Sequence, residues 1–337
     1  MGNSEIQVQF FQHIRNLLPP YKSLVDEVSD LLDISNDSAY RRIRGEKFID
    51  LEEIKKISQH FNISLDQIFN LQTNAIVFHG KLNSFTKDSF DDWFEDVLKQ
   101  IQMFHIQKKK HMYYLVKDLP PFYHLYFPEL ASFKFFFWMK SILHNESLKN
   151  EKFSFNNLLY YKLKDTSTKM INLFNQIPTT EIWNEEGINV TIRQIELYND
   201  MGLIPSQKEL KILFEQLLAV VNHLEKMAEL GLKFPLGKEP TAESAPYTMY
   251  VNDFVIGDNT IIAELDNVQI TYLNHSVMYF IGSMDPKFNE AMFYNLHNLI
   301  KKSTMISTVG EKERIRFFNK LRKKIEIKLA AILQEMD

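Results

Sequence analysis

A cluster of cationic side chains in the first fifth of the chain is the clearest indication of chemistry in the sequence. Arg41, Arg42 and Arg44 lie within four positions, and Lys47 follows them. Small polar residues at 35–38 come directly before the cluster, although the 337-residue chain has a net charge of −4. Guanidinium and ammonium groups suit phosphate oxygens, and small polar side chains suit the edges of bases.

Two short helices are predicted to position this cluster. Residues 24–32 carry apolar side chains at the spacing of one helical face, at Val25, Val28, Leu31 and Leu32. A second helix is expected at 38–44, with Ala39 and Ile43 on its inner face. Either Asp37 or Ser35 is expected to cap its start. Gly45 is expected to end it, because glycine enters the left-handed conformation at no steric cost.

Further short helices flank this pair. Residues 6–18 form an amphipathic pattern that ends at two prolines. A helix is expected at 50–61, beginning at the N-cap Asp50, and a last short one at 62–69, capped by Ser64. The first 70 or so residues therefore read as five short helices, and Tyr40, Arg41 and Arg44 are left to point outward from the third. This is the layout of a helix-turn-helix whose second helix enters the major groove.

The stretch "LVDEVSDLLDISNDSAYRRIRGEKFIDLEEIKKISQHFNISLDQIF" resembles the Cro/XRE-type, lambda-repressor-like helix-turn-helix domain. The match rests on the Leu/Val-rich second helix, the Ile34–Ser35 turn, the Arg44–Gly45 helix end and the tail at 50–69, and the resemblance covers about residues 5–70. The sequence departs from the family pattern at three positions: Ser29 in the middle of the second helix, Asp33 at the usual turn glycine, and Ile43 at a common glutamate.

The position of the recognition helix assigns roles to its residues. The first turn faces base edges, so the residues expected to read bases are Asn36, Asp37, Ser38, Tyr40 and Arg41. The flanks face the backbone, so the residues expected to contact phosphates are Lys22, Ser23, Arg42, Arg44 and Lys47. The competing interpretation is a solvated charged face, because residues 1–71 contain 8 basic and 11 acidic side chains, 8 − 11 = −3.

The sequence beyond about residue 75 has a different character. Two domains are predicted, a DNA-binding domain at 1–71 and an α+β effector or oligomerisation region at 75–337. The second is expected to be mostly helical to about 235, to contain an antiparallel β-meander at about 247–282 and to end in helices at 286–336. Within it, 206–230 is expected to be a helix with a capping box at Ser206 and Glu209. The fold class is therefore mainly α with a small antiparallel sheet.

No catalytic or metal-binding pattern stands out. The chain has no cysteine, its ten histidines show no zinc-type spacing, and no phosphate-binding loop or nucleophile motif is present. We expect neither a cofactor nor an enzyme. The 27 phenylalanines and other aromatic residues fit two hypotheses for the second region. One is a well-filled core, and the other is an apolar effector cavity above roughly 300 Å³.

The final helix has an apolar stripe and otherwise basic faces. The stripe comprises Ile315, Phe318, Leu321, Ile325, Leu329, Ile332 and Leu333. Three interpretations remain open: packing on its own domain, phosphate binding, and a dimer seam. We expect a homodimer formed through the region after residue 75, with this helix as the leading candidate, because two-fold assembly doubles the DNA contacts.

These observations favour a sequence-specific DNA-binding transcriptional regulator, with double-stranded DNA as partner and a C-terminal sensing or dimerising region. A small apolar molecule or a peptide is the candidate effector. One alternative is a peptide-responsive regulator with helical repeats, against which the missing repeat period counts. Another is an enzyme or scaffold that uses the helix-turn-helix for protein contacts. The lack of a signal peptide or bilayer-spanning run predicts a cytoplasmic protein without membrane contact.

Overall fold

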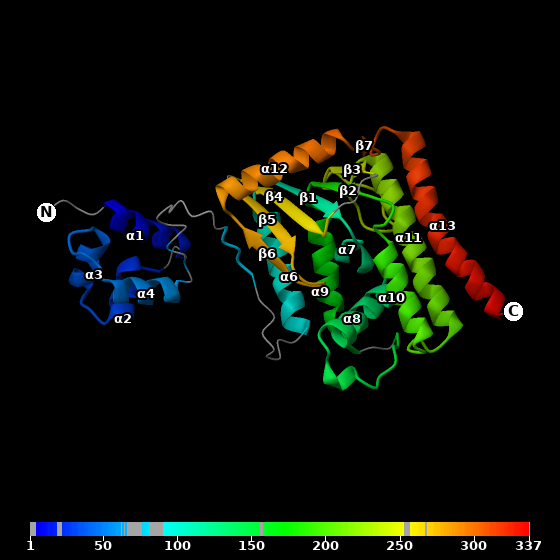
Figure 1. Ribbon diagram of the computed structural model, residues 1–337, viewed down its shortest axis with the longest axis horizontal. Helices are drawn as coiled ribbons and strands as arrows, with labels where there is room; N and C mark the ends of the chain where they lie inside the picture. Colours follow the sequence, from blue (N-terminus) through cyan, green and yellow to red (C-terminus); the bar gives the residue numbers. More distant parts are fainter. Residues whose placement is uncertain are drawn as a thin grey trace. The chain divides into compact units, whose positions relative to one another are not determined.

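The computed structural model describes residues 5–18, 22–61, 63, 65, 76–80, 90–155, 158–252, 257–266 and 268–336. The chain forms two compact units, residues 1–77 and residues 78–337 (Figure 1). The first is helical where it is described, and the second combines helices with a sheet. The expected fold class, an N-terminal helical domain followed by a larger α+β region, is confirmed.

Four helices build the described part of the N-terminal unit: α1 (Glu5–Leu17), α2 (Leu24–Leu32), α3 (Asn36–Ile43) and α4 (Leu51–His60). Their apolar faces meet in a core made by Phe10, Phe11, Ile14, Leu24, Val28, Ala39 and Ile57. The turn between α2 and α3 is tight because Asp33 adopts the left-handed conformation, with φ 53°. Aspartate tolerates that region better than most non-glycine residues. The helix expected at 62–69 lies largely outside the described residues.

Side-chain caps fix where these helices begin. Ser35 accepts a hydrogen bond from the backbone N–H of Ser38, so Ser35 rather than Asp37 is the N-cap of α3. Asp50 and Glu53 form a reciprocal capping box at the start of α4. Gly45 follows α3 with φ 73°, as its predicted role requires. Each such cap stabilises a helix by about 0.5–2 kcal/mol.

Seven strands form one mixed sheet in the described part of the C-terminal unit, in the order β6-β5-β4-β1-β2-β3-β7. Their bounds are β1 (Lys110–Val116), β2 (Thr179–Trp183), β3 (Tyr247–Val251), β4 (Thr260–Leu265), β5 (Val268–Asn274), β6 (Phe280–Ser283) and β7 (Thr304–Met305). The strands β1, β2 and β3 run parallel, with Met112 opposite Thr179 and Thr179 opposite Tyr247. The remaining pairs are antiparallel.

The predicted meander is only partly correct. Strands β4, β5 and β6 do form consecutive antiparallel pairs. Strand β3, expected to be the first strand of the meander, is separated from β4 by β1 and β2 and pairs in parallel with β2. Its neighbour in the sheet is therefore β2 and not β4, the next strand along the chain. The sheet is consequently larger than predicted and mixed.

Helices cover both faces of this sheet. On one face lie α6 (Phe90–Ile106), α7 (Pro121–His124), α8 (Pro128–Phe137), α9 (Leu158–Phe174), α10 (Asn189–Asp200) and α11 (Gln207–Leu230), and on the other lies α12 (Pro286–Lys301) (Figure 1). A π-helical turn, Trp138–Ile142, and a 3₁₀ turn, Glu146–Leu148, follow α8. The two faces have separate cores because alternate strand residues point to opposite sides.

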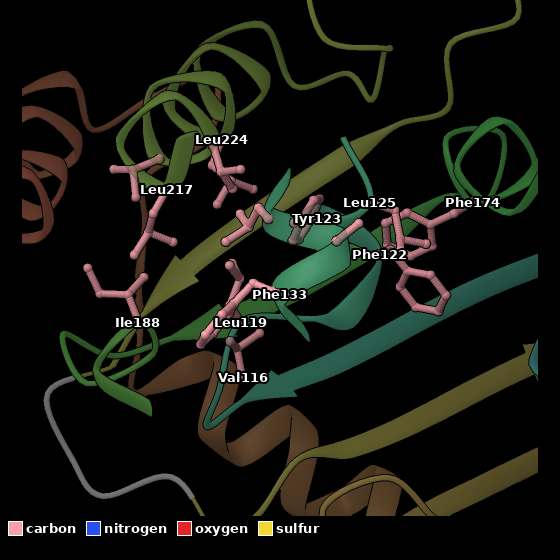
Figure 2. Close-up of a cluster of buried hydrophobic side chains, with 14 of the residues drawn as sticks. Val116, Leu119, Phe122, Tyr123, Leu125, Phe133, Phe174, Ile188, Leu217 and Leu224 are labelled. Atoms are coloured by element: carbon pink, nitrogen blue, oxygen red, sulfur yellow. The ribbon is translucent and has the colours of Figure 1, made fainter. Parts of the chain in front are cut away.

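Aromatic and aliphatic side chains together fill the larger core (Figure 2). The rings of Phe122 and Phe174 stack with centroids 4.3 Å apart, and Tyr123 meets Phe174 edge-on. The phenylalanines of α8, from Phe133 to Phe137, are all buried. Burying one such side chain contributes roughly 1.5–3 kcal/mol. Most of the aromatic residues noted in the sequence are therefore part of a hydrophobic core.

The last helix, α13 (Glu311–Met336), packs along α11 of the same chain. Four residues of the predicted stripe are buried there: Phe318, Leu321, Ile325 and Ile332. Its basic side chains pair with acidic residues of the same unit, for example Arg322 with Glu225 at 2.5 Å and Lys328 with Glu196 at 2.5 Å. These four residues pack within one chain, which supports the first of the three interpretations, while Ile315 and Leu333 remain 44% exposed.

Candidate nucleic-acid interface

Helix α3, the predicted recognition helix, has a narrow buried side. Ala39 is fully buried against the core, while Asn36, Asp37, Tyr40 and Arg41 are exposed. The amide of Asn36 donates to the carboxylate of Asp26 at 3.2 Å, which links the first turn of α3 to α2. Four of the five residues expected to read bases therefore lie on the solvent side of one helix. The fifth, Ser38, is half-buried.

Arg42 occupies a different position from the one predicted. Its side chain is only 7% exposed, and its guanidinium donates to both carboxylate oxygens of Glu53, with the shortest bond at 2.6 Å. A further bond of 2.6 Å runs from Arg42 to the hydroxyl of Ser38. These partners use the donors that a phosphate would need. The prediction that Arg42 contacts phosphate is therefore wrong. Arg42 instead holds α3 against α4.

Gln7 is a positioning residue that the sequence analysis missed. Its amide nitrogen donates to the backbone carbonyls of Arg42 and Lys47, at 2.6 and 2.7 Å, and its amide oxygen accepts the N–H of Ile49 at 3.1 Å. The side chain thus fixes the end of α3 and the loop after it to α1. The available signal was a polar residue on the face of α1 that also presents Phe10, Phe11 and Ile14 to the core.

The exposed basic surface centres on Arg41 and Arg44. Their side chains are 54% and 57% exposed, and Lys47 in the following loop is exposed too. The guanidinium of Arg44 lies 4.5 Å from the ring centroid of Tyr40, a cation–π contact. Glu46 lies between the two arginines, 4.0 Å from Arg41 and 3.9 Å from Arg44. At these distances in solvent the carboxylate holds neither arginine firmly.

The expected contacts at the start of α2 have partners within the unit. Lys22 forms an ion pair of 2.7 Å with Glu27, and this hydrogen bond to Lys22 lowers the pKa of Glu27. The hydroxyl of Ser23 caps α2 by accepting the N–H of Asp26. Both side chains are exposed. A phosphate at Lys22 would have to compete with Glu27.

A second group of polar residues lies in the C-terminal unit, around a cavity of about 120 Å³. Aromatic side chains form much of its wall, including Trp93, Phe94, Phe104, Trp138 and Tyr272, and the polar groups at its surface include Tyr114, Asp118, His124 and Lys134. This volume is below the roughly 300 Å³ of ordinary ligand pockets. This cavity therefore does not reach the size expected of an apolar effector cavity.

These polar groups do not form a recognisable pattern in the sequence. Asp118 follows β1, His124 ends α7 and Lys134 lies within the phenylalanine-rich α8. Asp118 and His124 both hydrogen-bond Thr191 of α10. A lysine between phenylalanines, in "FKFFF", was the one signal in the sequence that could have suggested a buried cation.

Among the described residues, no group of three histidine, cysteine, aspartate or glutamate side chains is arranged to hold a metal ion. Also within them, no helix combines the length and apolar character needed to cross a bilayer.

Comparison with known families gives one match, and it covers most of the N-terminal unit. Residues 12–88 match the family model of the BetR domain, a helix-turn-helix-like DNA-binding domain. The matched region includes α2, α3 and α4 and the last part of α1, so the geometry and the family model point to the same segment. No curated protein and no solved structure matches the chain significantly.

Proposed function

We propose that this chain, whose residues 12–88 match the BetR domain, is a sequence-specific transcriptional regulator that inserts α3 into the major groove of DNA. The observation that carries the proposal is the exposed face of α3. It presents hydrogen-bonding side chains at its first turn and Arg41, Arg44 and Lys47 at its end and in the next loop. This is the arrangement by which helix-turn-helix proteins separate base contacts from phosphate contacts. The Cro/XRE-type resemblance of the sequence supports the same docking.

Asn36, Asp37, Tyr40 and Arg41 would read bases. Ser38 would serve as a weaker contact, because its hydroxyl already accepts a bond from Arg42. Arg44, Lys47 and the residues at the start of α2, Lys22 and Ser23, would contact phosphates.

The C-terminal unit would supply assembly. One helix-turn-helix covers few base pairs, so a homodimer with half-sites about 34 Å apart, or a multiple of it, would give specific affinity. Four residues of the α13 stripe pack within the chain, so the seam would use another surface of residues 78–337. The mixed sheet of this unit does not favour a peptide-responsive regulator built from helical repeats.

Selection of bound fragments from randomised duplex DNA tests the proposal, followed by gel shifts of the selected site at several salt concentrations. We expect an enriched sequence motif, and binding that weakens steeply as salt rises. Binding without an enriched motif would contradict the proposed sequence specificity. Absence of binding at low salt would contradict DNA binding itself. Light scattering on the full chain tests the dimer, and a monomer at micromolar concentration would contradict it.

A further inference from the structure

The cavity of the C-terminal unit has the size of a small ring compound. An engineered apolar cavity of about 150 Å³ binds benzene, and this one, at about 120 Å³, is of the same order. Its aromatic wall comes from α6, where Trp93 and Phe94 lie, and from Trp138 after α8. Such walls favour a compact apolar body over water.

The polar groups at this cavity have unused hydrogen-bonding capacity. The hydroxyl of Tyr114, on a side chain only 1% exposed, has no partner among the described residues. The ring of His124 is held beside it, with Nε2 meeting the hydroxyl of Thr191 at 3.1 Å. Buried hydroxyls are normally satisfied by protein, water or ligand. An unsatisfied one at a cavity wall therefore indicates where a bound molecule would place a polar atom.

Lys134 adds donors at the same wall. Its ammonium is buried and donates to the side-chain oxygen of Gln194 at 2.6 Å, which uses one of its three N–H groups. Within the described part of the chain, no carboxylate lies within 4 Å of it. Burial lowers the pKa of Lys134, while the nearby Asp118 acts in the opposite direction. The ammonium lies 5.3 Å from the ring centroid of Trp138.

Charge balance selects among candidate ligands. Asp118 also lines the cavity and lies near enough to influence Lys134. The two opposite charges leave no net charge for a ligand to neutralise, so an anion or a cation would enter unpaired, which is costly in an apolar site. A neutral molecule with an acceptor oxygen meets the donors of Tyr114 and Lys134 without changing that balance.

We propose that this cavity binds a small neutral carbonyl compound, an apolar ring or short chain whose carbonyl oxygen accepts hydrogen bonds from Tyr114 and Lys134. The apolar body rests against Trp93, Phe94 and Trp138. This binding belongs to residues 78–337 and does not depend on the DNA-binding function proposed above.

Isothermal calorimetry on the full-length protein tests the proposal with three probes of similar size. These are cyclohexanone, methylcyclohexane, which lacks the oxygen, and benzoate, which carries a charge. We expect cyclohexanone to bind and the other two to bind at least about tenfold more weakly, the effect of a hydrogen bond made in a buried site. Absence of cyclohexanone binding at millimolar concentration, equal affinity for methylcyclohexane, or tighter binding of benzoate would each overturn the proposal.

Three variants locate the binding. Tyr114→Phe removes the unpartnered hydroxyl and keeps the ring, so we expect it to weaken cyclohexanone binding about tenfold and to leave methylcyclohexane unchanged. Lys134→Met removes the ammonium and should act in the same direction. Tyr126→Phe is the matched control, because the hydroxyl of Tyr126 already donates to Asn175 and Tyr126 does not line the cavity. If Tyr114→Phe binds cyclohexanone as the parent does, or if Tyr126→Phe loses as much affinity, the assignment of the site is wrong.

Discussion

The guanidinium of Arg42 and the carboxylate of Glu53 join the recognition helix to the next helix through three hydrogen bonds of 2.6 to 3.1 Å. The same carboxylate accepts the backbone N–H of Asp50 at 3.2 Å and so completes the capping box of α4. One acidic side chain therefore both starts α4 and holds α3 against it. The angle at which α3 is presented depends on this pair.

Arg42→Met should destabilise the N-terminal unit by about 2–4 kcal/mol, because it leaves the Glu53 charge without its partner in a mostly buried place. The double variant Arg42→Met, Glu53→Gln should lose less than the sum of the two single variants. Hydrogen exchange of the α3 and α4 amides in the full chain measures both effects. Strict additivity would show that the pair is not coupled.

Arg41→Ala and Lys47→Ala should affect DNA binding differently. Loss of a base contact by Arg41 should relax preference at one base pair by about 1–3 kcal/mol. Loss of a phosphate contact by Lys47 should weaken binding to all sequences and reduce the salt slope by about one unit. Gel shifts on the selected site and on point variants of that site distinguish the two. Unchanged binding by the double variant would exclude both roles.

Glu46→Gln should strengthen DNA binding by about two- to fivefold at low salt. The carboxylate lies within 4.0 Å of both Arg41 and Arg44 and repels a phosphate that approaches them. The gain should shrink as salt rises, because the surface charges are screened. Glu52→Gln is a control on the same unit, since no ion pair with Glu52 is found among the described residues. If Glu52→Gln strengthened DNA binding equally, the gain would come from the change in net charge and not from the position of Glu46 beside the two arginines.

Gly310→Ala should destabilise the C-terminal unit by more than about 2 kcal/mol. Gly310 has φ +69°, and an added Cβ would lie 2.5 Å from the carbonyl oxygen of Met305. Gly237→Ala is the matched control, with φ +71° and nothing within 4 Å of its Cβ, so it should cost only the conformational strain of about 1 kcal/mol. Chemical denaturation followed by tryptophan fluorescence reports on this unit, which contains Trp93, Trp138 and Trp183. If both variants lost the same free energy of unfolding, the contact between the added Cβ and the Met305 carbonyl would not contribute to the loss.

Acid should destabilise the C-terminal unit through His124. Burial, followed by the charge of Lys134, lowers the pKa of His124 well below its ordinary value of about 6.5. The unfolded chain then binds a proton that the folded chain refuses, so stability is lost as pH falls below about 6.5, by up to about 1.4 kcal/mol per pH unit. His124→Gln should flatten the dependence between pH 7 and 5. Burial raises the pKa of Glu181, which acts in the opposite direction. Glu181 is present in both the parent protein and the His124→Gln variant, so the difference between their pH profiles reports on His124. Identical pH profiles would contradict the prediction.

Local signals in the sequence predicted local structure well. Ser35, Asp50 and Ser206 cap helices as expected. These outcomes depend only on side chains and backbone a few positions apart. The inward direction of the Arg42 side chain could not be predicted in the same way. Its partner Glu53 lies in another helix, and a charge on a helix normally faces water unless such a partner exists.

The sheet shows the same limit on a larger scale. Strand β2, "TTEIW", was not anticipated, because Thr179, Thr180 and Glu181 do not form the apolar run typical of a central strand. All five of its residues are buried. The carboxylate of Glu181 accepts hydrogen bonds from Tyr123, Trp183 and Tyr247, and Tyr123 and Tyr247 come from other elements of the fold. A polar residue fits a central strand only when hydrogen-bond donors from distant parts of the chain satisfy it. A local sequence pattern cannot indicate whether such donors are present.

The parallel ladder β1-β2-β3 has a consequence for how quickly the two units reach their native state. Each neighbour in that ladder is far away along the chain, with Met112 opposite Thr179 and Thr179 opposite Tyr247. Pairings of high sequence separation form slowly because a long loop must close before they contribute, whereas a small helical unit folds from local contacts. During synthesis the helices of residues 5–60 are complete early, while the larger core waits for β3 and for the α13 helix that covers α11. The nascent chain would therefore carry a folded N-terminal unit while the sheet beyond it was still unassembled.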